Sequence, residues 1–80
     1  MAKVTLDQIK IIIGLQLGIK VVKENDRLVE ELGAESADLV NIIANVEERY
    51  SIHIKESEFS RIATAADLYS LVLSHLSEIE

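Results

Sequence analysis

The chain has 80 residues, 49% of them hydrophobic, and its 14 acidic and 8 basic residues give a net charge of -6. This length supports one small core, so we expect residues 1–80 to form a single domain that is stable by about 3–5 kcal/mol. The negative charge argues against binding nucleic acid or anionic lipid and favours partners with basic patches, while the absence of cysteine excludes a disulfide framework, a thiol nucleophile and a cysteine-based metal site.

The first predicted helix begins at Thr5 and ends near Gly18. Thr5, followed by Gln8 three residues later, has the pattern of a capping box, and apolar residues then recur at three- and four-residue steps. The apolar run "IIIGLQLGI" is too short for a bilayer, which needs about 20 residues. With no signal-like N-terminus either, we expect a cytoplasmic protein without membrane insertion.

A long connection is predicted for residues 18–35, where no helical pattern continues. A loop of about 18 residues is unusual in so small a domain. We therefore expect it to be attached to the core by apolar residues and to contain a short turn near Asp26–Leu32. The expected attachment points are Val21, Val22, Leu28, Val29 and Leu32.

The second predicted helix runs from Ser36 to Tyr50, with Ser36 as its N-cap, a position that serine favours. Its expected buried face comprises Leu39, Val40, Ile43, Val46 and Tyr50. The following "SIHI" alternates like a strand but has no partner strand. We interpret it as an extended link with Ile52 and Ile54 packed inward.

A short helix or turn is predicted over residues 57–62, and the last helix from Thr64, where Asp67 completes a second capping pattern. Leu68, Leu71, Val72 and Leu76 continue its apolar face. The fold class is therefore all-α: a small antiparallel bundle of three main helices plus one short helix, with a long first loop.

Ser36 is also the main candidate for chemistry. As a hydrolytic nucleophile it would need a nearby base, but the only histidines, His53 and His75, are distant in sequence, and no nucleophile elbow surrounds it. We therefore predict that the chain is not an enzyme. The helix start would instead favour a phosphodiester on Ser36, because free N–H groups and the positive end of the helix dipole meet there.

The segment "LGAESADLVNIIANVEERYSIHI" resembles the attachment motif of the acyl carrier proteins, Leu-Gly-x-Asp-Ser-Leu-Asp followed by an acidic helix. Leu32, Gly33, Ser36 and Asp38 match that motif. The stretches "IKIIIGLQLGIK" and "RIATAADLYSLV" resemble the family's first helix and the start of its last one, so the resemblance extends over the whole chain.

The resemblance implies a non-catalytic carrier that holds acyl groups as thioesters on a 4′-phosphopantetheine arm attached to Ser36. Such a monomeric carrier shuttles them between enzymes of fatty acid, lipid or polyketide synthesis. The implied partners are a phosphopantetheinyl transferase and acyl-transfer and condensing enzymes with basic docking patches. The implied docking residues are Glu35, Ala37, Asp38, Glu47 and Glu48. The implied acyl cavity is lined by Val40, Ile43, Val46, Leu68 and Leu71.

Two positions depart from the family motif, because Glu35 and Ala37 stand where relatives have Asp and Leu. They suggest a specialised carrier. The sequence leaves open a peptidyl or aminoacyl carrier, and an unmodified helical adaptor of the same fold. No metal site is expected, since the acidic clusters lack calcium-loop spacing and the two histidines are isolated.

Overall fold

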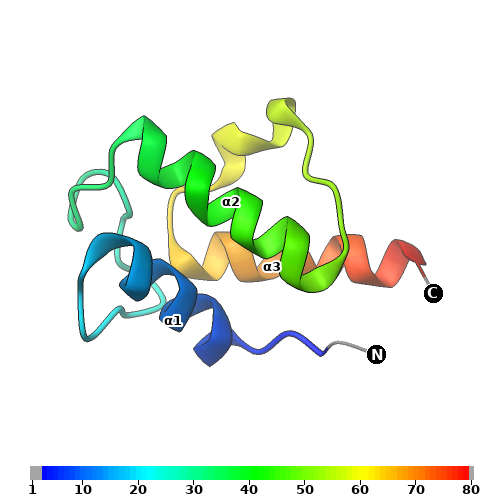
Figure 1. The fold of residues 1–80 in the computed structure, drawn as a ribbon, viewed down its shortest axis with the longest axis horizontal. Coiled ribbons are helices and arrows are strands. Elements are labelled where there is room, and N and C mark those ends of the chain that lie inside the picture. Colours follow the sequence, from blue (N-terminus) through cyan, green and yellow to red (C-terminus); the bar gives the residue numbers. More distant parts are fainter. Residues whose placement is uncertain (1–2, 80) are drawn as a thin grey trace.

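Helices make up most of the computed structural model, which describes residues 3–79, with side chains described up to Ser77. The elements are α1 (Leu6–Leu17), α2 (Ser36–Tyr50), the short 3₁₀ helix η1 (Glu56–Arg61) and α3 (Ala65–Ile79). The all-α bundle is thus confirmed. α1 runs opposite to α2 and α3, which point the same way (Figure 1). No helix in residues 3–79 has the length and apolar character required to cross a membrane.

Local sequence signals fix both ends of α1. The Thr5 hydroxyl accepts a hydrogen bond from the Gln8 N–H at 3.1 Å, and Gln8 Oε1 accepts one from the Thr5 N–H at 3.1 Å. At the other end, Gly18 adopts the left-handed conformation with φ of 70°, which glycine tolerates without steric cost. Both predicted signals are confirmed.

Gly14 lies where the long loop turns back over α1. A Cβ atom at this position would be 2.6 Å from the Ile19 carbonyl oxygen, closer than real contacts allow. The Ile19 N–H donates to the Gly14 carbonyl at 2.9 Å. The absence of a side chain at Gly14 therefore permits the loop to close against the helix.

The long loop is attached to the core at fewer points than predicted. Val22 and Leu28 are buried, but Val21 is 70% exposed and Val29 is 54% exposed, so the prediction for these two valines is wrong. Val21 precedes the buried Val22, and Val29 follows the buried Leu28. The non-helical backbone directs such adjacent side chains to opposite sides. Leu32 packs partly against the core.

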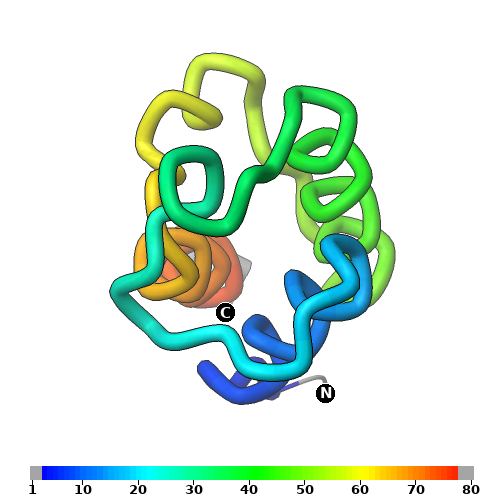
Figure 2. The backbone as a smooth tube through the Cα atoms, turned by 90° about the vertical axis from the view of Figure 1, so that its left-hand side faces the viewer, coloured from blue at the N-terminus to red at the C-terminus, as the bar shows by residue number. Residues whose placement is uncertain are grey.

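Figure 2 shows the same loop beside the start of α3, and backbone hydrogen bonds hold it there. The Leu28 N–H donates to the Ala63 carbonyl at 2.9 Å, and the Ala66 N–H donates to the Glu24 carbonyl at 2.9 Å. Arg27 and Thr64 form an isolated β-bridge. The loop is therefore an ordered part of the bundle, and it delivers the chain to α2 in a defined position.

The buried face of α2 contains Ile42 in place of the predicted Val40, and the predicted Leu39 is only partly buried. Ile42, Ile43, Val46 and Tyr50 are buried, whereas Val40 is 54% exposed. The prediction of a buried Val40 is therefore wrong. Successive residues of an α-helix are about 100° apart, so Val40 lies at the flank of this face and Ile42 lies within it.

The last third of the chain follows the expected order. Ile54 is buried and Ile52 packs partly against the core, in an extended link. η1 begins one residue before the predicted turn. At the start of α3, Asp67 Oδ2 accepts hydrogen bonds from the backbone N–H groups of Ala63 and Thr64 at 3.0 Å each, and the Asp67 N–H donates to the Thr64 hydroxyl at 3.1 Å. This confirms the second capping box.

Candidate functional site

Ser36 is the first residue of α2, and its side chain is exposed. The residue at the N-cap is Glu35, which has extended backbone angles (φ of -96° and ψ of 170°). The predicted N-cap role of Ser36 is therefore wrong by one residue. The physical reason is Asp38, whose carboxylate accepts a hydrogen bond from the Glu35 N–H at 3.0 Å and so starts the helix one residue earlier.

The carboxylate of Asp38 is committed to contacts inside the chain. Its Oδ1 also accepts a hydrogen bond from Gln16 Nε2 of α1 at 3.2 Å. The bond from the Glu35 backbone, and then that from Gln16, lower the pKa of Asp38 below its ordinary value, against a smaller opposing effect of burial. A negative charge thus stays fixed beside Ser36, and α1 is joined to the start of α2.

The approach to Ser36 is also fixed. Gly33 has a φ of 74°, which suits glycine. Ala34 is buried, and its N–H donates to the Leu28 carbonyl at 2.8 Å. The chain is therefore held at Leu28 and Ala34 just before it reaches the exposed serine.

A cavity of about 170 Å³ lies next to Ser36, between α2, the long loop, η1 and α3. Apart from Ser36 its lining is entirely apolar: Leu28, Leu39, Val40, Ile42, Ile43, Phe59, Ile62 and Leu68. An apolar cavity of similar size in another protein stays dry and takes up small apolar guests. The site thus combines an exposed hydroxyl with an adjoining apolar cavity.

The residues expected to line an acyl cavity divide into two groups. Val40, Ile43 and Leu68 line the cavity beside Ser36, with Val40 on its exposed side. Val46 and Leu71 are buried but lie elsewhere in the core.

The remaining lining residues are not among those predicted from the sequence. Ile42 was missed because the apolar pattern of α2 allowed either neighbouring face. Phe59 and Ile62 were missed because the packing of η1 over α2 leaves no periodic signal.

The residues expected to contact partners are not equally available. Glu35, Ala37 and Glu48 are exposed. Glu47 is partly buried, and its carboxylate accepts a hydrogen bond from the Ile54 N–H at 2.9 Å and lies 3.2 Å from His53 Nδ1. Glu47 therefore organises the link after α2 as well as adding charge.

Each histidine lies beside a carboxylate of the chain. His53 contacts Glu47, which is 11 residues after Ser36 and so about 16 Å further along the helix. His75 lies 3.0 Å from Glu58 of η1. Across the part of the chain that the structure describes, no three His, Asp or Glu residues gather as a metal ion would require.

Comparison with known proteins finds a matching family model, similar sequences and similar folds. The family model described as "Phosphopantetheine attachment site" matches residues 7–72. The acyl carrier protein of Wolinella succinogenes is 39% identical over 64 residues, covering 78% of this chain and 84% of the relative. That of Chlamydia felis is 32% identical over 74 residues, covering 90% and 95%. The crystal structure of an acyl carrier protein from Thermotoga maritima is similar with a TM-score of 0.79 and 26% identity, covering 94% of this chain and 89% of that one.

Proposed function

The chain belongs to the acyl carrier protein family, and from this premise we propose that it carries acyl groups as thioesters on a 4′-phosphopantetheine arm attached to Ser36. Members of this family are carriers and not enzymes, and their covalently attached cofactor is 4′-phosphopantetheine. The observation that supports Ser36 most directly is its position: an exposed hydroxyl at the first residue of α2, beside an apolar cavity.

The start of α2 suits the phosphodiester that would join the arm to Ser36. Backbone N–H groups of the first helical turn have no partners within the helix, and the helix dipole favours a negative charge there by about 0.3–1 kcal/mol. Glu35 and Asp38 oppose that charge, but Glu35 is exposed and water screens it. The arm supplies the thiol for the thioester, which this cysteine-free chain lacks.

The apolar cavity beside Ser36 is proposed to shelter the first part of the acyl chain. Each methylene transferred from water to such a lining gains about 0.8 kcal/mol. A cavity of about 170 Å³ takes only a short apolar segment. A longer chain would therefore require Phe59 and Ile62, on the η1 side, to move outward.

The exposed face around Ser36 is proposed to receive a phosphopantetheinyl transferase and acyl-transfer and condensing enzymes with basic patches. Glu35 and Glu48 are available to those patches, and such rim charges accelerate encounter more than they prolong binding. Ala37 offers little apolar surface. Val40, three residues on and 54% exposed, lies on the same side of the helix and supplies an apolar contact instead. We infer from this altered contact that the carrier serves a dedicated set of enzymes.

Intact-mass measurement after incubation with coenzyme A and a broad-specificity phosphopantetheinyl transferase tests the attachment. We expect the wild-type chain to gain the mass of one 4′-phosphopantetheine and Ser36→Ala to gain none. Ser57→Ala, which also removes an exposed serine hydroxyl, is the matched control and should load fully. An unmodified wild-type chain would favour a helical adaptor, and loading of Ser36→Ala would place the arm elsewhere.

A further inference from the structure

The basic residues of the chain are concentrated at its start. Residues 1–23 hold four of the eight basic residues, Lys3, Lys10, Lys20 and Lys23, but only one of the 14 acidic residues, Asp7. This segment comprises α1 and the first part of the long loop. The first segment of this strongly acidic chain is therefore locally basic in sequence.

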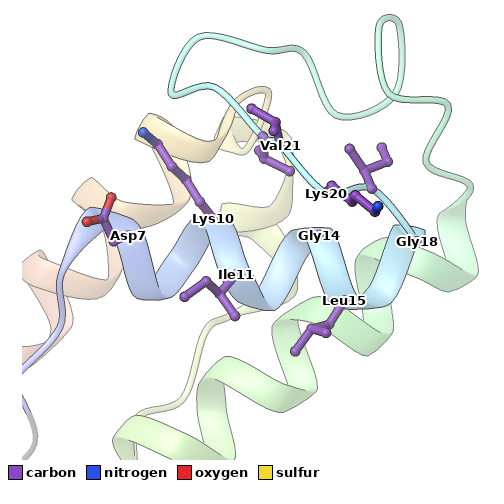
Figure 3. A pocket seen from close by; sticks show the side chains of 10 residues that line it. Asp7, Lys10, Ile11, Gly14, Leu15, Gly18, Lys20 and Val21 are labelled. Carbon is purple, nitrogen blue, oxygen red and sulfur yellow. The ribbon is translucent and has the colours of Figure 1, made fainter.

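The same region contains the three most exposed large apolar side chains of those that the structure describes. Leu15 is 80% exposed, Val21 is 70% exposed and Ile11 is 60% exposed. Figure 3 shows Ile11 and Leu15 on one side of α1 and Val21 across from them on the loop, with Gly14 between. Single exposed apolar residues are ordinary on protein surfaces, but a group of them marks an interaction site.

These three side chains surround one hollow of about 660 Å³ on the α1 surface. We call Ile11, Leu15 and Val21, with Lys10 and Lys20 beside them, the α1 patch. Gly18 leaves open space at one end of the hollow, while Ile19 and Val22 add apolar surface. The patch is therefore an open groove with an apolar surface and lysines at its edge.

We propose that the α1 patch binds a segment of a partner protein in which a ridge of apolar side chains is flanked by carboxylates. The apolar ridge would fill the hollow between Leu15 and Val21. The flanking carboxylates would pair with Lys10 and Lys20, the two basic residues of the groove lining. Lys10 also lines a neighbouring hollow with Glu24, Asp26 and Glu31, whereas Lys20 does not. Asp7, the other charged residue of the lining, would repel an acidic group at that end and so favour one direction of binding.

Two other occupants fit less well. Anionic membranes are recognised by clusters of about four to eight Lys or Arg residues, whereas this groove has two lysines and belongs to a chain of net charge -6. A second copy of the chain would bring another charge of -6, so that the two copies repel each other. A short acidic segment on a different protein needs only the two lysines and brings less negative charge than a second copy.

The α1 patch is separate from the site at Ser36. No residue lines both the groove and the cavity beside Ser36. The two sites are nevertheless neighbours, because Gln16, next to Leu15, donates a hydrogen bond to Asp38 in the first turn of α2 at 3.2 Å. This proposal does not depend on the attachment of the arm, and the two can fail independently.

The test uses the full chain and two synthetic peptides of about four helical turns. Both peptides place leucines at i, i+3, i+4 and i+7, flanked by Glu in one and by Lys in the other. We expect the Glu peptide to bind about tenfold more tightly than the Lys peptide. In NMR spectra the amide signals of Ile11, Leu15 and Val21 should shift. Leu15→Lys should abolish binding, and Lys10→Glu with Lys20→Glu should reverse the preference.

Matched variants separate this site from general effects. Val29→Lys places a lysine at a 54% exposed valine outside the groove, and Lys55→Glu with Arg61→Glu changes the net charge as much as the double reversal does. Both should bind the Glu peptide as the wild type does. Equal binding of the two peptides, or shifts confined to α2, would overturn the proposal. So would binding only to phosphatidylglycerol vesicles, or self-association abolished by Leu15→Lys.

Discussion

The Tyr50 hydroxyl at the end of α2 donates a hydrogen bond to Gln8 Oε1 in the first turn of α1 at 3.1 Å. At the opposite ends of the same helices, Gln16 Nε2 donates to Asp38 Oδ1 at 3.2 Å. Antiparallel α1 and α2 are therefore joined at both ends by side-chain hydrogen bonds. The second of these bonds lies two residues from Ser36, so the helix pairing also fixes the backbone that presents the serine.

Tyr50→Phe should lower the free energy of unfolding by about 0.5–1.5 kcal/mol, because it removes this partly buried hydrogen bond and keeps the ring. The ring itself is buried, so packing is preserved. Urea denaturation followed by circular dichroism measures the change. Tyr69→Phe, in α3, is the control and should have a smaller effect. Equal effects of the two variants would show that the bond to Gln8 contributes nothing specific.

Acidification should destabilise the fold partly through Asp38. Its pKa is lowered in the folded chain, first by the hydrogen bond from the Glu35 backbone and then by that from Gln16. The ionised carboxylate thus contributes stability that is present above its unfolded pKa, near 3.8, and is lost as the pH falls through the lower folded pKa.

Thermal unfolding of Asp38→Asn and the wild type between neutral and acidic pH tests this dependence. The difference in Tm between the two proteins should be largest at neutral pH. It should shrink as the pH falls from the unfolded pKa of Asp38 through its lower folded pKa. Asp7→Asn, an exposed position in the first turn of α1, provides the comparison for a general loss of charge. A difference in Tm that stays constant with pH would contradict the role of Asp38.

Gly14→Ala should destabilise the protein, although the same change at an open helical site stabilises by about 0.5–1 kcal/mol. The added Cβ would lie 2.6 Å from the Ile19 carbonyl oxygen, which is backbone and cannot move without displacing the loop. The measurement is the free energy of unfolding, which should be lower for Gly14→Ala than for the wild type. A stabilised variant would mean that the loop does not close against α1 as described.

Signals within a few residues of one another were readable from the sequence. The capping boxes at Thr5 and Asp67 and the termination at Gly18 need only neighbouring side chains and backbone, so the helix bounds followed from them. The start of α2 shows the limit of this reasoning. Serine favours the N-cap, but Asp38 reaches the Glu35 N–H, and this moves the cap by one residue.

Which of two nearby apolar residues faces the core could not be read from the sequence. Val40 was expected inside and Ile42 was not, although only Ile42 is buried. The apolar pattern of α2 permits both choices, and the packing of the other elements decides between them. Val21 and Val29 were misplaced for the same reason. Of the three misplaced valines, Val40 lines the cavity beside Ser36 and Val21 lines the groove on α1, so both lie at candidate contact surfaces.

Val40 and Val29 offer a matched test of the acyl cavity, because both are 54% exposed and only Val40 lines the cavity beside Ser36. Loading Ser36 with acyl-phosphopantetheine arms of increasing length should raise Tm until the cavity is full, because each buried methylene adds about 0.8 kcal/mol to the stability. Val40→Ser should reduce this increase, because it replaces an apolar edge of the cavity with a hydroxyl, whereas Val29→Ser should leave it unchanged. Differential scanning calorimetry of the unacylated and acylated forms of each variant gives the comparison. If acyl length has no effect on Tm in any variant, the chain stays in solvent and the cavity is only a packing defect.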